Sequence, residues 1–254
     1  MSQSLKKGIE ALLFLASRRS VGVTELAEAL QINKSTAFRI LDTFLEANMV
    51  EKHKETAKYK LGPAILRLSE QYYKNFSIIA TAKPLMERLA AEIRESVHLC
   101  VLANHSAVII EQIMSDSRLV VNARIGNVEP LHCSSVGKCL LAFAPDDKRE
   151  RMIDGLSYEV FTEKTIDNRD RFLEEIQKIR TQGHAMDDGE LSRDIRCVAV
   201  PVFNSNGACN YSLGVSGAAS RMTPEKVARI VSMLTKTGKE LSAELGYSAR
   251  KDEH

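Results

Sequence analysis

Several side chains in the second half of the chain have the types and spacing needed for acid–base or metal chemistry. The stretch MDDGELSRDIRC places two adjacent carboxylates, Asp187 and Asp188, shortly before the thiol of Cys197, and His132 lies upstream. Paired carboxylates can exchange protons or bind a cation, and a thiol beside an imidazole can act as a nucleophile. A single Cys in an apolar strand is more often a packed core residue. We therefore expect no catalytic site, and an enzymatic or metal site built from Asp187, Cys197 and His132 stays an alternative.

A second polar stretch, HCSSVGKCLLA, resembles a phosphate-binding loop because it contains a GK pair at 137–138. The pattern GxxxxGK[ST] requires Gly where His132 stands and Ser or Thr where Cys139 stands, so the match fails. Ser134 and Ser135 remain at the expected start of a helix. There, free N–H groups can hold a carboxylate, or the serines simply cap the helix, which is the more common role.

A third polar cluster begins the segment QINKSTAFRILDT, residues 31–43. At 100° per residue, the apolar residues of this segment and the next turn share one helix face: Ala37, Ile40, Leu41, Phe44 and Leu45. The N-terminal turn and the opposite face are more polar, and the expected DNA-binding residues there are Lys34, Ser35, Thr36, Phe38, Arg39 and Thr43. An isolated polar stripe is usually a solvated face, so the neighbouring elements decide between the two interpretations.

The side chains of this segment suit double-stranded DNA. Arg39 can donate two hydrogen bonds to a guanine, and Ser35 or Thr36 can reach base edges or phosphate oxygens. Lys34 lies at the helix N-terminus, where free N–H groups and the helix dipole also favour a phosphate.

The elements around the segment are those of a winged helix-turn-helix. Apolar residues at helical spacing predict a first helix, with one face formed by Leu5, Ile9, Leu12, Leu13 and Ala16. Thr24 is a candidate N-cap for a short second helix, and MVEKH and KYKL predict two short strands joined by a charged tip. This order of elements predicts DNA binding, with Lys58 and Lys60 of the wing beside the DNA backbone.

The chain divides into a winged helix-turn-helix over residues 1–62, a linker helix over 63–77 and a second domain over 78–254. In the second domain, VHLCVLA, AVIIEQI and RLVVNARI predict strands, and RCVAVPVF with CNYSLGVSG predicts a hairpin. Helices are expected at TAKPLMERLAAEI, SSVGKCLLAFA and DRFLEEIQKIRTQG. Gly183 closes the last of these, and Thr223 caps a final helix. Antiparallel strands surrounded by helices indicate an α+β domain.

The charge and the cysteines limit the possible partners and surroundings. The 254 residues carry a net charge of +2, but residues 1–62 hold ten Lys and Arg against seven Asp and Glu, which points to an anionic partner there. Five dispersed cysteines without a CxxC pair form no disulfide or zinc pattern and suit a reducing cytoplasm. Lys6-Lys7 before ALLFLAS imitates a signal peptide, but the apolar run is short, so we expect neither export nor a membrane span.

In combination and order, these motifs resemble those of the IclR-type bacterial transcriptional regulators from end to end. In the first domain the resemblance rests on KGIEALLFLA and TELAEALQINKSTAFRILDTFLEANMVEK. In the second it rests on LHCSSVGKCLLA, GHAMDDGELSRDIRCVAVPVF and SLGVSGAASRMT. The resemblance implies a winged helix-turn-helix, a linker helix and a C-terminal GAF-like effector domain. It also implies homodimers, often dimers of dimers, on pseudo-palindromic operators in double-stranded DNA.

The resemblance further implies where a small effector binds. The pocket lies between the start of the SSVGK helix, the Asp before the RC strand and the end of the SG strand. Carried onto this chain, the expected effector-binding residues are Ser134, Ser135, Val136, Asp187, Cys197 and Ser216. Many relatives bind small carboxylates or hydroxy- and keto-acids there, and others bind aromatic compounds.

Two departures from the family pattern bear on the ligand. Before the GK pair this chain has Ser135 and Val136 where relatives often have Gly or Ala, which narrows the pocket or adds a hydroxyl contact. The last strand motif ends in SGA where relatives often have SGP, without an expected consequence. A carboxylate on the helix N-terminus leaves Asp187 to accept a hydrogen bond from a hydroxyl, so a hydroxy-acid fits better than a dicarboxylate.

The sequence therefore predicts a cytoplasmic, sequence-specific DNA-binding regulator, a repressor rather than an activator, without a cofactor or enzymatic activity. Its operator binding is expected to respond to a small organic acid, a hydroxy- or keto-carboxylate, bound in the C-terminal domain. The alternatives are a metal- or redox-sensing regulator that uses Cys133, Cys139 or Cys197, and an enzyme with an accessory DNA-binding domain.

Overall fold

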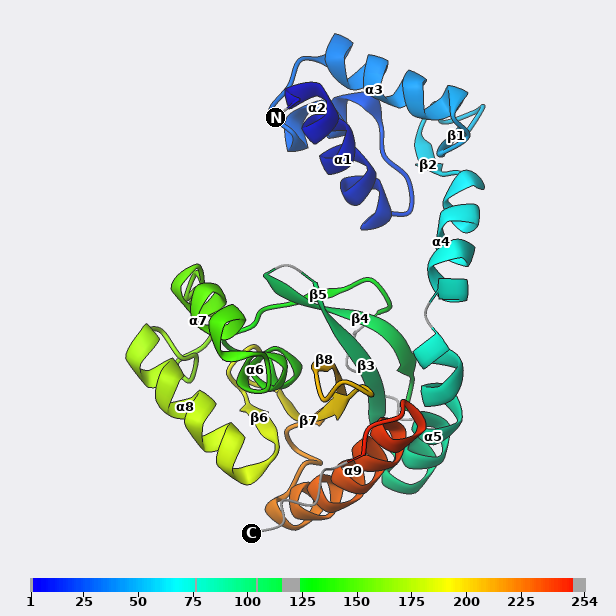
Figure 1. Cartoon of the computed structure of the whole chain (residues 1–254). Helices are drawn as coiled ribbons and strands as arrows, with labels where there is room; N and C mark the ends of the chain where they lie inside the picture. Colours follow the sequence, from blue (N-terminus) through cyan, green and yellow to red (C-terminus); the bar gives the residue numbers. More distant parts are fainter. Residues whose placement is uncertain (1, 76, 104, 116–123, 249–254) are drawn as a thin grey trace. The chain divides into compact units, whose positions relative to one another are not determined.

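The structure is a computed structural model of the chain, and it describes residues 2–75, 77–103, 105–115 and 124–248 (Figure 1). The backbone forms two compact units, residues 1–77 and residues 78–254. Within the described ranges, no helix has the length and apolar character needed to cross a membrane.

Between residues 2 and 75, three helices precede a two-stranded wing and a fourth helix follows it. The elements are α1 (Gln3–Ala16), α2 (Val23–Ala29), α3 (Lys34–Glu46), β1 (Val50–Lys52), β2 (Tyr59–Leu61) and α4 (Ala64–Asn75). The wing strands pair antiparallel, with Val50 opposite Leu61 and Lys52 opposite Tyr59. This arrangement confirms the predicted winged helix-turn-helix.

The core of this unit lies where the first three helices and the wing meet. Its buried residues are Ala11, Leu15, Val21, Leu26, Ala27, Ala37, Leu41, Val50 and Tyr59. Leu26 of α2 and Leu41 of α3 are completely buried because the apolar faces of these two helices pack together. The backbone of Tyr59 exchanges two 2.8 Å hydrogen bonds with Val21 in the loop between α1 and α2, so the wing is attached to the core.

The apolar face predicted for the first helix is not the face that is buried. Leu5, Ile9 and Leu13 share one helix face as predicted, and they are exposed, as is Ala16. Ala11 and Leu15 are buried instead, and an added Cβ on Gly8 of the same face would lie 3.5 Å from the ring of Phe44. This face of α1 packs into the core and against β2 of the wing, so the bulkier apolar stripe stays outside.

The described residues of the C-terminal unit contain a six-stranded antiparallel sheet. In spatial order the strands are β5 (Val128–Glu129), β4 (Ser106–Ile113), β3 (Ser96–Ala103), β8 (Cys209–Ala218), β7 (Ile195–Phe203) and β6 (Ala185–Asp188). The pairs β3–β4 and β7–β8 are consecutive in the chain, and β8 returns to the centre of the sheet beside β3. The sheet confirms the predicted antiparallel α+β domain.

Helices cover both faces of this sheet. They are α5 (Ser77–Ile93), α6 (Ser135–Ala142), α7 (Asp146–Asp154), α8 (Arg169–Gln182) and α9 (Pro224–Glu244). The helices α5 and α9 lie on one face, joined by the Arg88–Glu240 ion pair at 2.5 Å, while α6 covers the other, with α7 and α8 packed against α6 (Figure 1). The larger core lies between the sheet and the α6 layer and includes Leu140 and Phe172, both completely buried.

Helix ends in this unit follow the sequence signals. Gly183 ends α8 in the left-handed conformation at φ 77°, and the Thr223 hydroxyl accepts a hydrogen bond from the Lys226 N–H at the start of α9, as predicted. The elements β6 and α7 were not predicted, because each is short and has too few apolar residues to show a period. The predicted strand RLVVNARI (118–125) falls largely outside the described residues.

Two leucines on the predicted apolar face of α3 test the packing of the N-terminal unit. Leu41 is completely buried, whereas Leu45 is 36% exposed. We expect Leu41→Ala to lower the free energy of unfolding by about 2–5 kcal/mol, because it leaves a cavity, and Leu45→Ala to lower it much less. Urea denaturation followed by circular dichroism measures both values. Equal losses for the two variants would contradict this description of the core.

Candidate functional site

The polar side of α3 is positioned by a cap at its first turn. Asn33 is the N-cap residue, and its side-chain oxygen accepts hydrogen bonds from the Thr36 N–H and the Ser35 hydroxyl, each 2.8 Å long. The preceding Gln31 has a positive φ of 52°, so the chain turns sharply between α2 and α3. The turn and the cap begin the helix at Lys34, where the sequence predicted it.

The structure leaves most of the predicted DNA-binding residues of α3 on the surface. The exposed members are Lys34, Ser35, Phe38, Arg39 and Thr43, and Thr36 is half-buried. The hydroxyl of Thr43 donates a 2.9 Å hydrogen bond to the Arg39 carbonyl within the helix. This hydroxyl can therefore only accept a further hydrogen bond while that contact is kept. Phe38 is 46% exposed and gives this otherwise polar face an apolar contact point.

The wing adds two lysines in different surroundings. Lys58 is exposed just before β2, whereas Lys60 within β2 forms a 3.0 Å ion pair with Glu51 on β1. An exposed pair of this kind is weak and screened by salt, so Lys60 can exchange Glu51 for a phosphate at small cost. DNA contact by the two lysines and by the residues of α3 stays a prediction.

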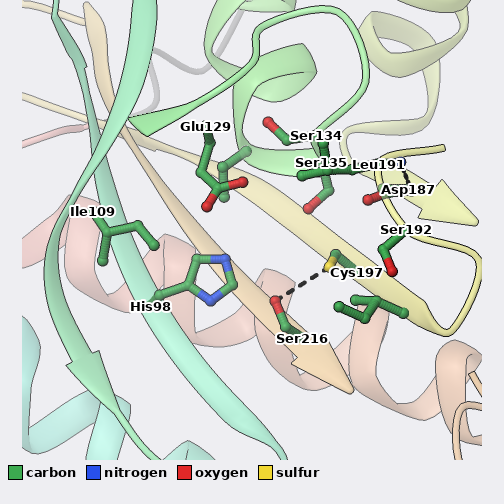
Figure 2. Close-up of a pocket in the computed structure, with 12 residues that line it drawn as sticks. His98, Ile109, Glu129, Ser134, Ser135, Asp187, Leu191, Ser192, Cys197 and Ser216 are labelled. Atoms are coloured by element: carbon green, nitrogen blue, oxygen red, sulfur yellow. Dashed lines mark hydrogen bonds between the residues drawn. The ribbon is translucent and has the colours of Figure 1, made fainter. Parts of the chain in front are cut away.

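The six predicted effector-binding residues surround one cavity of about 270 Å³ in the C-terminal unit (Figure 2). They are Ser134, Ser135, Val136, Asp187, Cys197 and Ser216. The strand register explains why they meet: Asp187 of β6 lies opposite Cys197 of β7, which in turn lies opposite Ser216 of β8. Residues in direct register point to the same face of a sheet, so this row faces the start of α6. That an effector binds here stays a prediction.

The start of α6 forms one wall of the cavity. Ser134 is the N-cap residue, and its hydroxyl accepts a 3.1 Å hydrogen bond from the Gly137 N–H and donates a 2.6 Å hydrogen bond to the Pro130 carbonyl. Helix capping, the more common of the two predicted roles, therefore occupies this hydroxyl. Ser135 and Val136 are the first two helical residues, whose N–H groups have no acceptor within the helix. These two N–H groups are the donors that an anion can use.

Asp187 forms part of a second wall and is 1% exposed. Its Oδ1 atom accepts hydrogen bonds from the N–H of Glu190 at 2.6 Å and from the N–H of Leu191 at 3.4 Å. Burial raises the pKa of Asp187 to about 6, and it outweighs the hydrogen bonds and the nearby Lys138, which lower it. The carboxyl group therefore changes its charge close to neutral pH.

The GK pair at 137–138 has a structural role. The ammonium of Lys138 is completely buried and pairs with Glu175 at 3.0 Å and with Glu190 at 2.5 Å, which joins α6 to α8 and to the loop after β6. Gly137 is required because a Cβ there would lie 2.4 Å from the Pro130 carbonyl oxygen. Lys138 does not line the cavity. Gly137 and Lys138 thus fix α6 in place. The GK pair therefore has a structural role here and does not indicate a phosphate-binding loop.

The sequence did not identify the other half of the cavity wall: His98, Ile109, Glu129, Leu191, Ser192 and Ile195. Figure 2 shows His98 from β3 and Glu129 from β5 pointing into the cavity. Burial raises the pKa of Glu129, and the nearby Asp187 adds to the shift. Burial alone lowers the pKa of His98 to about 4. The available signal was a polar residue within the apolar strand VHLCVLA, a pattern that more often marks a core histidine.

The enzymatic alternative combines Asp187, Cys197 and His132, but only Asp187 and Cys197 line the cavity. The Nε2 atom of His132 lies 2.9 Å from the Glu159 carbonyl oxygen, and His132 does not line the cavity. Burial raises the pKa of Cys133 to about 12 and raises the pKa values of Cys139 and Cys197 above their usual range. Such thiols stay protonated at neutral pH and react slowly. In the part of the chain that the structure describes, no three His, Cys, Asp or Glu side chains are grouped to hold a metal ion.

Comparisons with known proteins cover almost the whole chain. The sequence model of the IclR helix-turn-helix domain matches residues 4–54, and that of the bacterial transcriptional regulator IclR C-terminal domain matches residues 70–243. The chain is 32% identical over 244 residues to the HTH-type transcriptional regulator KdgR of Escherichia coli K12. The matching region covers 96% of this chain and 93% of that protein. It is 27% identical to the transcriptional repressor IclR of the same organism, over 96% of this chain and 90% of that protein.

A similar fold occurs in the crystal structure of an IclR homolog from Microbacterium hydrocarbonoxydans complexed with 4-hydroxybenzoate. The TM-score is 0.81 at 20% sequence identity, and the match covers 97% of this chain and 100% of that chain. At this identity the likeness concerns the fold alone, and it agrees with the predicted combination of a winged helix-turn-helix and an antiparallel sheet with flanking helices.

The raised pKa of Asp187 links the stability of the fold to pH. The folded state keeps a proton on Asp187 up to about pH 6, whereas the unfolded chain loses it near pH 3.8. Asp187 alone therefore lowers the stability of the wild type by about 3 kcal/mol as the pH rises through this window. Asp187→Asn keeps a carbonyl acceptor for the Glu190 N–H but does not ionise, so it should gain most of that amount on the wild type between pH 4 and pH 7. Urea denaturation at the two pH values measures the gain.

Asp188→Asn is the matched control for this prediction. Burial acts to raise the pKa of Asp188, but hydrogen bonds from Lys164, at 2.9 Å, and from Arg196 outweigh it, so the pKa is lowered. The stability that Asp188 contributes is present above pH 3.8 and is lost only as the pH falls further. The control should gain nothing between pH 4 and pH 7, and an equal gain in both variants would refute the role of Asp187.

Proposed function

The chain belongs to the IclR family of bacterial transcriptional regulators, and we propose that it is a repressor controlled by a small hydroxy- or keto-carboxylic acid. The observation that carries this proposal is that one chain holds an exposed, capped helix α3 and, in its other unit, a cavity at the N-terminus of α6. A relative of this chain is a transcriptional repressor. We infer a cytoplasmic protein that acts without a cofactor and without enzymatic turnover.

The recognition helix α3 enters the major groove of the operator. Arg39 donates two hydrogen bonds to a guanine, and Ser35 and Thr36 contact base edges or phosphates. Phe38 packs against a thymine methyl group, the apolar partner that the major groove offers. Lys34 binds a phosphate at the helix N-terminus.

The remaining DNA contacts position the protein on the duplex. Thr43 lies one turn beyond Arg39 on the exposed side of α3, and Lys58 and Lys60 extend the basic surface onto the wing. Contacts of this kind to the phosphate backbone set the register without reading the sequence. They also make the affinity depend on salt concentration.

A second copy of the chain covers the apolar stripe of α1. Leu5, Ile9 and Leu13 recur at every fourth residue, so they share one helix face, and they are 65%, 51% and 67% exposed. A contiguous apolar stripe on a surface helix indicates a protein–protein contact. A pseudo-palindromic operator also requires two recognition helices about one DNA turn (~34 Å) apart. We assign the stripe to a homodimer, from which a dimer of dimers assembles.

The effector binds with its carboxylate at the start of α6. The N–H groups of Ser135 and Val136 receive the carboxylate, and Asp187 accepts a hydrogen bond from a hydroxyl of the ligand. Ser216 and Cys197 complete the wall on the strands. A protein of the same fold was crystallised with 4-hydroxybenzoate, which is a hydroxylated carboxylic acid. This ligand supports the proposed class, and the volume of about 270 Å³ restricts the effector to a small molecule.

The effector changes operator binding only if it favours one arrangement of the dimer over another. Metal or redox sensing is the weaker candidate, because burial keeps the thiol of Cys133 protonated and the Nε2 atom of His132 is hydrogen-bonded to the Glu159 carbonyl group. The decisive test selects operator DNA from random sequence and titrates the complex with hydroxy- and keto-acids. A specific complex whose affinity responds to an acid is the expected result. The absence of a sequence-specific complex would refute the proposal.

Variants of Arg39 and Lys58 distinguish contacts with the bases from contacts with the DNA backbone. Arg39→Ala should weaken binding to the selected operator by about 1–3 kcal/mol per half-site while leaving non-specific binding nearly unchanged. Lys58→Ala should weaken both kinds of binding alike and reduce the salt dependence by about one phosphate contact. Fluorescence anisotropy at several salt concentrations measures both effects. If Arg39→Ala leaves the affinity for the operator unchanged, α3 is not the recognition helix.

The apolar stripe of α1 is tested by a charge in its centre. Ile9→Glu should abolish cooperative binding to an operator with two half-sites, because it places a carboxylate in the dimer contact. Gln3→Glu adds the same charge at an exposed position of α1 outside the stripe and serves as the control. Gel-shift titrations with one and two half-sites measure the cooperativity. Intact cooperativity in the Ile9→Glu protein would exclude this face as the contact.

A further inference from the structure

His98 is a polar group of the cavity that the proposed function does not use. It lies on β3 and is 4% exposed, and its Nδ1 atom has no hydrogen-bond partner among the described residues. Figure 2 shows the imidazole projecting into the cavity between Glu129 and Ser216. Buried polar atoms in native proteins nearly always have partners. The imidazole as a whole projects into a ligand-sized cavity, so a ligand there is its natural partner.

The neighbouring strand makes room for the ring by omitting a side chain. Gly214 of β8 lies directly opposite His98 in the β3–β8 ladder. A Cβ on Gly214 would lie 2.5 Å from the Nε2 atom of His98 and 2.8 Å from the side chain of Val136. Any other residue at 214 would therefore displace the imidazole. The same geometry shows that the ring and the start of α6 are close enough for one small molecule to touch both.

The chemical state of the cavity determines what His98 can bind. Burial lowers the pKa of His98 to about 4, so the ring is neutral at physiological pH and offers one N–H donor and one nitrogen acceptor. Among the described lining residues, Glu129 and Asp187 are the carboxyl groups, and none is Lys or Arg. Ionised carboxylates only accept hydrogen bonds, and a hydroxyl group both donates and accepts. Hydroxyl groups therefore match this wall, whereas a second carboxylate does not.

We propose that His98 hydrogen-bonds a hydroxyl group of the effector and thereby selects hydroxylated acids over their unsubstituted counterparts. This inference rests on the proposed function, because it takes the carboxylate of the acid to lie on the N–H groups of Ser135 and Val136. With the carboxylate held there, the carbon chain passes the side chain of Val136 and presents its hydroxyls to His98. An unsubstituted chain offers the imidazole of His98 no hydrogen-bond partner, which the site penalises.

The experiment compares matched acids on the full chain and its variants. The probes are straight-chain monocarboxylic acids of three to six carbons, each in its unsubstituted form and in its fully hydroxylated form. Isothermal titration calorimetry should show that the wild type prefers a hydroxylated acid to its unsubstituted counterpart by about tenfold or more. His98→Leu should lose about tenfold in affinity for the hydroxylated acid and little for the unsubstituted acid, so its preference should fall by about tenfold.

Two further variants separate a ligand contact from a structural role. His98→Asn places an amide near the position of Nδ1 and should recover most of the preference. Gly214→Ala leaves every polar group of the cavity in the chain but displaces the ring, so it should reduce the preference as His98→Leu does. The melting temperature of each variant without acid shows whether it is folded, and any variant that is not folded leaves the other two to decide.

The outcomes distinguish this inference from the proposed function. An undiminished preference in a folded His98→Leu or Gly214→Ala protein would overturn the role of His98 while the binding of acids stands. A His98→Asn protein that is folded but has lost the preference would also overturn it, because a structural role would then explain the loss. If the wild type binds none of the acids, the proposed effector class fails, and the inference fails with it.

Discussion

The buried ion pairs of Lys138 hold together the parts of the C-terminal unit on which the cavity depends. A completely buried ammonium needs counter-charges, and Glu175 of α8 and Glu190 after β6 supply them. The backbone N–H of Glu190 donates to Asp187, so the same contact positions the wall formed by α6 and the wall formed by β6. Loss of one partner from such a buried pair leaves an uncompensated charge, which costs far more than the loss of an exposed pair.

The cavity that results has two chemically different sides. The start of α6 offers N–H donors because the first turn of any helix leaves them unpaired. The strands offer Asp187 and Glu129, whose pKa values are raised mainly by burial, and a neutral His98. One side therefore suits an anion and the other suits groups that donate hydrogen bonds. This polarity is the physical reason for preferring an acid that also carries hydroxyl groups to an acid with a second carboxylate.

Features with a strong local signal could be predicted from the sequence. The start of α3 depends on the Asn33 cap and an adjoining turn, and six cavity residues belong to motifs that are contiguous in the chain. Features that depend on distant neighbours could not be predicted. The buried face of α1 carries Ala11 and Leu15 and depends on its fit to the rest of the core, which an apolar period does not reveal. The placement of His98 depends on Gly214, more than a hundred residues away, whose importance appears only when β3 and β8 are paired.

The attachment of the wing to the helical core limits the ways in which this protein can be regulated. The backbone of Tyr59 in β2 is hydrogen-bonded to Val21, and its ring lies in the same core as Leu41 of α3. The wing and the recognition helix therefore form one rigid body. A ligand in the other unit cannot reshape one part of this body without breaking its core. Under the proposed function, regulation therefore acts on the separation of two such bodies. The affinity for DNA that carries a single half-site then does not respond to the effector.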